Sequence, residues 1–129
     1  MQRFDLVEKL KVAEDQASSL NGELQAFVKQ FVEAHRKFKD GQKVEVFDSR
    51  GISYGIGFVK YAQCGVMFRW GSVARQYAGR EEQWLKDLCD IMYAVVKAKK
   101  DGTPSERSLM WDKAREEKRE GYYYLTTAE

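Results

Sequence analysis

The sequence has 129 residues, 43% of them hydrophobic and 33% charged, with a formal net charge of +2 at pH 7. This length and composition indicate one soluble domain with an extension, large enough for a hydrophobic core. They exclude a membrane-spanning class, because no run approaches the roughly 18 apolar residues of a span, and the first residues do not form an apolar signal stretch. We therefore expect a cytoplasmic protein with no membrane partner.

Charge is distributed unevenly along the chain. Residues 1–35 carry four Lys or Arg and six Asp or Glu, a net charge of −2. Residues 36–80 carry nine Lys or Arg and three Asp or Glu, a net charge of +6. Residues 81–129 carry nine Lys or Arg and eleven Asp or Glu, a net charge of −2. Basic segments attract phosphates through counterion release and long-range steering. The middle segment is therefore a candidate for nucleic-acid binding, and an ordinary solvated basic face is the alternative.

A ladder of ten apolar positions occupies the first third of the chain, at alternating steps of four and three. This heptad spacing is typical of helices that wrap around one another. It predicts a helix from about Phe4 to Lys37, about 50 Å long at about 1.5 Å per residue, which is more than a small domain covers by itself. We therefore expect a homo-oligomer, most simply a dimer. The predicted interface residues are Leu6, Leu10, Ala13, Ala17, Leu20, Leu24, Phe27 and Phe31, and the ladder continues through Ala34 and Phe38.

The middle of this predicted helix has a weak point at Asn21-Gly22. Asn-Gly is also a turn signal, so a helical hairpin is the alternative. A continuous helix is favoured because the ladder keeps its register across the pair. The aromatic end of the ladder, Phe27, Phe31 and Phe38, is also a candidate for the core of the adjoining domain.

The period changes from helical to alternating after Asp40-Gly41, a pair that terminates helices. Strands are predicted where apolar and polar residues alternate, at 43–47, 54–61 and 66–70. They would form a three-stranded antiparallel meander, with a fourth short strand within 72–77. Gly55 and Gly57 fall on one face of the middle strand, where glycine marks a bulge or a sharp bend.

The run FKDGQKVEVFDSRGISYGIGFVKY resembles the opening strands of small SH3-like barrels of the KOW and Tudor kind. It has a glycine before the first strand, alternating valines, and Gly-x-Gly-x-Val in the second. The resemblance lies within residues 38–70 and implies a binding module for proteins or nucleic acids rather than an enzyme. It assigns no aromatic cage, although Phe47, Tyr54, Phe58 and Tyr61 are candidates, and the fifth strand of such a barrel is not adjacent in the sequence.

Two helices are predicted in the C-terminal part. The first begins at Glu81-Glu82 and stops at Asp101-Gly102, with acidic residues at its start and lysines at its end. The second begins at a capping box with proline at the first helical position, Thr103-Pro104-Ser105-Glu106, and becomes polar on all sides. The apolar face of the first helix consists of Trp84, Leu85, Leu88, Ile91, Met92, Val95 and Val96.

The segment Tyr122–Leu125 follows Gly121 and favours β structure. We predict a final strand that returns to the edge of the meander, and a tyrosine-rich contact surface for a partner is the alternative. The predicted fold class is thus α+β: a long heptad helix, a small antiparallel SH3-like barrel or meander, two C-terminal helices and a final edge strand. The predicted domains are residues 1–39, the heptad helix, and 40–129, the barrel with its helices.

Residue types that carry chemistry are sparse. The single histidine, His35, has no Ser, Cys or Asp placed near it in a catalytic pattern. The glycines of the middle strand form neither a dinucleotide nor a phosphate loop motif, and no spacing typical of metal ligands occurs. Cys64 and Cys89 are too few for a disulfide framework, and we expect free thiols. The sequence predicts a non-enzyme without cofactor or metal.

Three hypotheses of function follow from these patterns. The first is a self-associating protein-interaction module, such as an adaptor, inhibitor or assembly component, with a protein partner. The second is nucleic-acid binding, in which cations contact phosphates and aromatic rings stack on bases. The third is an oligomer that holds a small phosphorylated ligand with the same cations. The candidate nucleic-acid or anion-binding residues are Lys43, Arg50, Lys60, Arg69, Arg75, Tyr54, Tyr61 and Trp70.

Overall fold

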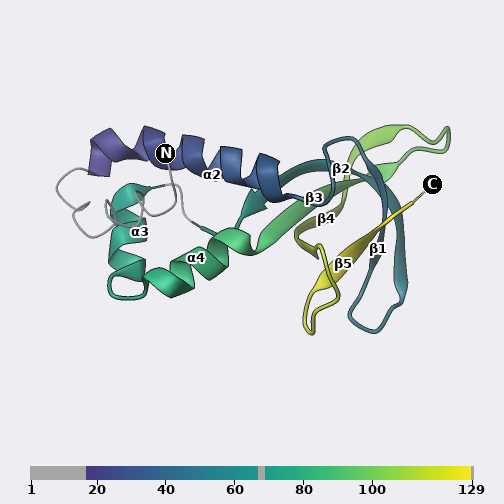
Figure 1. The fold of residues 1–129 in the computed structure, drawn as a ribbon. Coiled ribbons are helices and arrows are strands. Elements are labelled where there is room, and N and C mark those ends of the chain that lie inside the picture. Colours follow the sequence, from purple (N-terminus) through teal and green to yellow (C-terminus); the bar gives the residue numbers. More distant parts are fainter. Residues whose placement is uncertain (1–16, 67–68, 129) are drawn as a thin grey trace. The chain divides into compact units, whose positions relative to one another are not determined.

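The computed structural model describes residues 17–66 and 69–128, which form a mixed α+β fold (Figure 1). The chain packs as two compact units. The first, which we name the helical unit, consists of Met1–His35 and Cys64–Asp90, and the second, the barrel unit, consists of Arg36–Gln63 and Ile91–Glu129. The helical unit thus includes a segment that lies in the sequence between two strands of the barrel unit.

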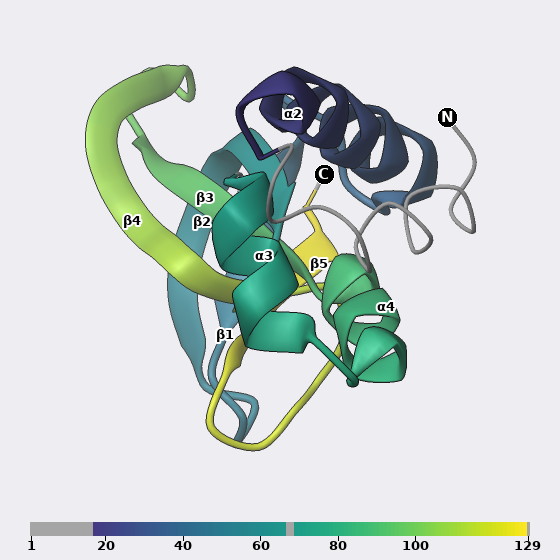
Figure 2. The ribbon, with the colours of Figure 1, turned by 90° about the vertical axis from the view of Figure 1, so that its left-hand side faces the viewer.

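Three helices build the described part of the helical unit: α2 (Ala17–His35), α3 (Trp70–Tyr77) and α4 (Glu81–Cys89) (Figure 2). Helix α2 runs without a break through Asn21-Gly22, which confirms the continuous helix over the hairpin. The Asn21 side chain has another role, because its Oδ1 accepts a hydrogen bond of 2.5 Å from the Trp70 backbone N–H at the start of α3. The first residues of the predicted helix, 4–16, lie outside the described residues.

The described heptad positions of α2 pack inside their own unit. Leu20, Leu24, Phe27 and Phe31 are buried, and α2 packs against α3 and α4. Those helices contribute buried Trp70, Val73, Tyr77, Trp84 and Leu88. The ladder therefore supplies a core within the chain over this stretch. Of the other predicted interface residues, Leu6, Leu10 and Ala13 lie outside the described residues, and Ala17 begins α2. Ala34 is exposed, and Phe38 is buried in the barrel unit.

The barrel unit is a small closed barrel with the strand order β1-β2-β3-β4-β5. The strands are β1 (Lys43–Phe47), β2 (Ser53–Cys64), β3 (Ile91–Ala98), β4 (Pro104–Arg115) and β5 (Tyr123–Thr127). Strand β1 is antiparallel to both β2 and β5, and β4 is antiparallel to β3 and parallel to β5. The predicted final strand is confirmed, and it closes the barrel against β1. This closed barrel is compatible with the SH3-like architecture.

Glycines in β2 allow the barrel to bend tightly. A Cβ atom added at Gly57 would collide with the Val96 carbonyl oxygen and lie 2.8 Å from Val95 Cγ1, so only glycine fits there. Gly55 has φ +119°, and the register between β1 and β2 shifts between Val46 and Phe47. The predicted bulge or sharp bend is therefore confirmed.

The predicted short strand within 72–77 is wrong, because Trp70–Tyr77 is helix α3. Of the predicted strand at 66–70, Trp70 begins this helix and residues 67–68 lie outside the described residues. Trp70, Val73, Ala74 and Tyr77 are the buried residues of α3 and follow the helical spacing of three, four and seven. The short apolar run before the helix hid this period, since a run of that length fits a strand equally well.

Both predicted C-terminal helices differ from the structure. The first ends at Cys89, and Ile91–Ala98 is strand β3. Consecutive residues Tyr93 to Val96 are all buried, and a strand buried on both faces produces an apolar run that also fits one face of a helix. The predicted second helix is strand β4. Thr103, its predicted cap, donates hydrogen bonds from N (3.0 Å) and Oγ1 (2.6 Å) to Asp101 Oδ1 in the β3–β4 hairpin.

Candidate functional site

The barrel unit exposes large apolar side chains at the start of β2. Ile52, Tyr54 and Ile56, which we name the β2 apolar row, have exposed fractions of 53%, 47% and 43%. A single exposed apolar side chain is ordinary. Three within five consecutive positions make a patch of the kind that marks interaction surfaces.

The turn before β2 holds the row in place through Asp48. Its Oδ1 accepts hydrogen bonds from the backbone N–H groups of Arg50 and Ile52, both at 2.9 Å. Its Oδ2 accepts bonds from the Arg50 guanidinium at 3.2 and 3.0 Å. The hydrogen bond from Ile52 is the main cause that lowers the pKa of Asp48 below its ordinary value. An ionised Asp48 therefore fixes the backbone at the beginning of the row.

Aromatic rings support the same end of the barrel. The Tyr54 ring meets the Tyr123 ring edge to face, with 5.0 Å between centroids, and Phe47 stacks on Tyr124 at 5.4 Å. The hydrogen bond with Tyr123 is the main cause that raises the pKa of Tyr54. Tyr123 and Tyr124 are half-buried, so the tyrosine-rich segment serves the barrel structure. Its use as a contact surface remains a prediction.

A basic and an acidic side chain flank the β2 apolar row. Arg50 precedes the row, and 74% of its side chain is exposed although it pairs with Asp48. Glu45 on β1 lies directly opposite Ile56 in the strand register. Its Oε2 accepts a 2.6 Å hydrogen bond from Ser53 Oγ. The row is therefore apolar, with the Arg50 guanidinium before its first residue and the Glu45 carboxylate beside Ser53.

A second cluster joins β2 to β4. Trp111 has an exposed fraction of 46% and meets the Tyr61 ring edge to face at 5.2 Å. Lys60 Nζ lies 5.8 Å from the centroid of the Trp111 ring. We name Lys60, Tyr61 and Trp111 the Trp111 cluster. Sequence reasoning missed Trp111 because it placed that residue in a helix; assignment of the segment to a strand would have made it a candidate.

The predicted nucleic-acid residues belong to several elements of the two units. Lys60 and Tyr61 come together in the Trp111 cluster, whereas Arg50 and Tyr54 lie at the β2 apolar row. Lys43 lies on β1 and is half-buried. Arg69 and Arg75 belong to the other unit, where they are exposed. Trp70 is fully buried there, which corrects its prediction as a base-stacking residue.

A metal site is built from His, Cys, Asp and Glu side chains. Over 17–66 and 69–128, no set of three His, Cys, Asp or Glu side chains could hold a metal ion. The His35 ring stacks on Phe31 with 4.1 Å between centroids, and its Nδ1 is 2.9 Å from the Phe31 carbonyl oxygen. This pairing gives His35 a local structural role at the end of α2.

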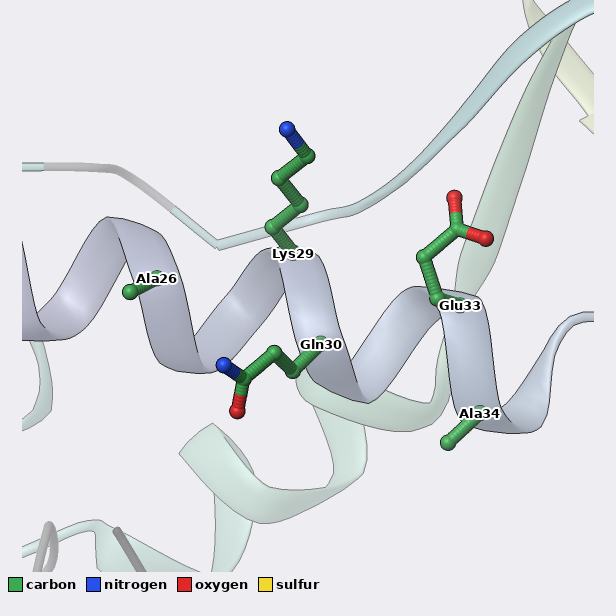
Figure 3. Close-up of a pocket in the computed structure, with 5 residues that line it drawn as sticks. All are labelled: Ala26, Lys29, Gln30, Glu33 and Ala34. Atoms are coloured by element: carbon green, nitrogen blue, oxygen red, sulfur yellow. The ribbon is translucent and has the colours of Figure 1, made fainter.

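Helix α2 also carries a shallow surface hollow. Ala26, Gln30 and Ala34 follow one another at successive turns along one side of the helix, and Lys29 and Glu33 point to the other side (Figure 3). All five residues are exposed. The hollow is therefore an open surface and does not enclose a ligand.

Comparison with known proteins adds no relative: no family model matches the chain, and neither a curated protein nor a solved structure matches it. Among the helices of the described part, none is long and apolar enough to cross a membrane.

Proposed function

We propose that this chain is a non-catalytic, self-associating protein-interaction module. The observation that carries the proposal is the β2 apolar row, three large apolar side chains exposed on a closed barrel. The resemblance of residues 38–70 to barrels of the KOW and Tudor kind supports the same function, because it implies a binding module. The partner we propose for the row is the barrel of a second copy of this chain.

The charges beside the row favour a second copy as its partner. In a two-fold dimer the same patch meets itself, so each residue i contacts a residue j and j contacts i. Two rows packed antiparallel around Tyr54 would bring Ile52 of one copy onto Ile56 of the other. Arg50 of one copy would then approach strand β1 of the other copy at Glu45, whose backbone is paired with Ile56 in the register. The row is thus complementary to itself in charge as well as in polarity.

Side chains rather than strand edges would make this contact. A closed barrel offers no unpaired edge to which another strand could add. The described heptad residues are used in the core of the helical unit, so the proposal assigns self-association to the barrel. The heptad positions at 6–13 remain a predicted additional contact.

Light scattering on charge variants tests the dimer. We expect the unaltered chain to have a dimeric mass at high micromolar concentration. Arg50→Glu and Glu45→Arg should each shift it to a monomer, since each places like charges opposite one another. The double variant should recover the dimer, which separates lost pairing from damage to the Asp48 turn.

Arg75→Glu makes the same charge change on the exposed surface of the helical unit and should leave the mass unchanged. A monomeric unaltered chain, or a double variant that stays monomeric, would contradict the proposed dimer.

A second candidate function is the binding of single-stranded nucleic acid at the Trp111 cluster. An exposed tryptophan beside a lysine suits base stacking together with phosphate attraction. The β3–β4 hairpin adds exposed cations on the same unit: Lys97, Lys99, Lys100 and Arg107. By sequence, the barrel unit has 14 Lys or Arg and 10 Asp or Glu, a net charge of +4. The helical unit has 8 Lys or Arg and 10 Asp or Glu, a net charge of −2. The cations predicted to hold a small phosphorylated ligand belong to both units.

Oligonucleotide binding at two salt concentrations tests this candidate. Fluorescence anisotropy with a labelled single-stranded oligonucleotide should show binding that weakens steeply with salt. Trp111→Ala should weaken it by about tenfold, the effect of one lost base stack, whereas Tyr54→Ala, a change at an exposed ring outside the cluster, should not. Absence of binding at low salt would exclude this function and leave the dimer test unaffected.

A further inference from the structure

The fold brings the two cysteines of the helical unit to the same place. Cys64 ends β2 and begins the segment Cys64–Asp90, and Cys89 ends α4. The Cys64 thiol donates a hydrogen bond of 2.7 Å from Sγ to the carbonyl oxygen of Leu88. That carbonyl belongs to the peptide bond that joins Leu88 to Cys89. The Cys64 sulfur therefore lies against the backbone of Cys89, although the two residues are far apart in sequence.

The two thiols differ in accessibility. Cys89 is exposed, whereas Cys64 is buried. Burial is the main cause that raises the pKa of the Cys64 thiol to about 12, and the nearby Cys89 contributes next. A buried, protonated thiol is a poor target for an oxidant in solution, because the thiolate is the reactive form. An oxidant in solution would therefore attack Cys89 first, with Cys64 placed to react second.

We propose that Cys64 and Cys89 are an oxidation site that forms a reversible disulfide when the protein meets a peroxide. In the first step the Cys89 thiol loses its proton and the thiolate attacks one oxygen of hydrogen peroxide, so an S–O bond forms and the O–O bond breaks; the second oxygen leaves as hydroxide, which takes up the released proton and becomes water. In the second step the Cys64 sulfur attacks the sulfenic acid sulfur of Cys89, so the S–S bond forms, the S–O bond breaks, and a second water leaves with the Cys64 proton. Two thiols are oxidised and one hydrogen peroxide is reduced to two waters.

The disulfide would close most of the inserted segment into a covalent loop. Helices α3 and α4 both lie between Cys64 and Cys89. They are already joined by a hydrogen bond of 2.5 Å from Tyr77 Oη to Asp87 Oδ2. A cross-link at the two ends of this pair restricts the unfolded chain more than the folded one. Oxidation should therefore raise the Tm of the helical unit by about 5–10 °C.

Intact-mass analysis of the full chain tests the site. The chain is treated with about two equivalents of hydrogen peroxide, free thiols are then blocked with N-ethylmaleimide, and thermal unfolding is followed by circular dichroism. We expect a chain that is not cross-linked to a second copy and is about 2 Da lighter, as two lost hydrogens require. Neither cysteine should react with N-ethylmaleimide, and the Tm should be higher. Dithiothreitol should reverse all three changes.

Two serine variants serve as controls. Cys64→Ser keeps a hydroxyl donor toward the Leu88 carbonyl oxygen, so the fold is retained while oxidation stops at a sulfenic acid on Cys89 that dimedone labels. Cys89→Ser should leave the buried Cys64 thiol unoxidised.

The unaltered chain decides the question even where a variant folds poorly. Oxidation that yields only cross-linked dimers through Cys89, or sulfinic acid on Cys89 with Cys64 still a free thiol, would overturn the proposal. Neither outcome depends on the dimer of the barrel unit, because the site lies wholly in the helical unit.

Discussion

The two units differ in the exposure of their tryptophan side chains. In the helical unit, Trp70 and Trp84 are completely buried. In the barrel unit, Trp111 and the β2 apolar row are exposed, and among the described residues these are the most exposed large apolar side chains. Tryptophan therefore belongs to the core of one unit and to the surface of the other.

A tryptophan pair tests this contrast with the largest expected effect. Trp84→Ala removes a fully buried ring from the helical unit and should lower the free energy of unfolding by about 3–5 kcal/mol. Trp111→Ala removes a half-exposed ring and its edge contact with Tyr61, and should cost about 1 kcal/mol or less. Urea unfolding followed by circular dichroism measures both. Equal losses would mean that the exposed tryptophan is structural.

A glycine pair tests backbone packing in the two units. Gly57→Ala places a Cβ against the Val96 carbonyl and should destabilise the barrel by about 1–3 kcal/mol. Gly22→Ala in helix α2 meets nothing within 4 Å, and alanine favours helix, so it should stabilise by about 0.5–1 kcal/mol. Chemical denaturation of the two variants should therefore give shifts of opposite sign. A neutral Gly57→Ala would contradict the close approach of β2 and β3.

Tyr93 on β3 makes a buried polar contact within the barrel unit that a substitution can test. Tyr93 Oη accepts hydrogen bonds from the Lys37 and Phe38 N–H groups at 3.0 and 3.2 Å and donates one of 2.5 Å to Glu116 Oε1. Tyr93→Phe removes this acceptor from the buried Phe38 N–H and should cost about 1–2 kcal/mol. Amide hydrogen exchange should show lost protection at Phe38 and unchanged protection in α4, which belongs to the other unit.

Low pH should reduce the stability of the barrel unit, and this is the smallest of the expected effects. The pKa values of Asp48 and Asp101 are both lowered, by hydrogen bonds first from the Ile52 backbone and from the Thr103 side chain, respectively. Their stabilising contribution is present above the unfolded value of 3.8 and is lost as the pH falls through the lower folded values. The denaturation midpoint should therefore drop between about pH 4 and pH 2.

Asp48→Asn is the control for this pH effect. The variant should show a smaller drop over the same range and lower stability at neutral pH, since an amide accepts less strongly from the Arg50 and Ile52 N–H groups. An identical drop in the variant and the unaltered chain would exclude Asp48 as a cause.

The success of sequence reasoning also differs between regions. Strands β1, β2 and β5 and the unbroken helix α2 were predictable because alternation, turn residues and heptad spacing are local patterns. Helix α3 and strand β3 were not, because their apolar runs fit either period. Strand β4 was not, because the Thr103-Pro104-Ser105-Glu106 signal favours a helix start. At the candidate surfaces, Arg50, Tyr54, Lys60 and Tyr61 were predicted from residue type. Ile52, Ile56 and Trp111 were not, since their exposure cannot be read from the sequence.

The sequence by itself determined strands β1 and β2, the glycine bend in β2 and the returning last strand, because bulges, turns and alternation depend on neighbouring residues. Only the tertiary structure decided that the segment 64–90 joins helix α2, that the ladder residues Leu24 and Phe27 become core, and that the Cys64 thiol meets the backbone beside Cys89. Those outcomes depend on which apolar surfaces meet across the chain. The free energy released per unit of buried apolar area is roughly the same whichever segment covers that area. The apolar pattern of the sequence alone therefore does not decide which segments pack together.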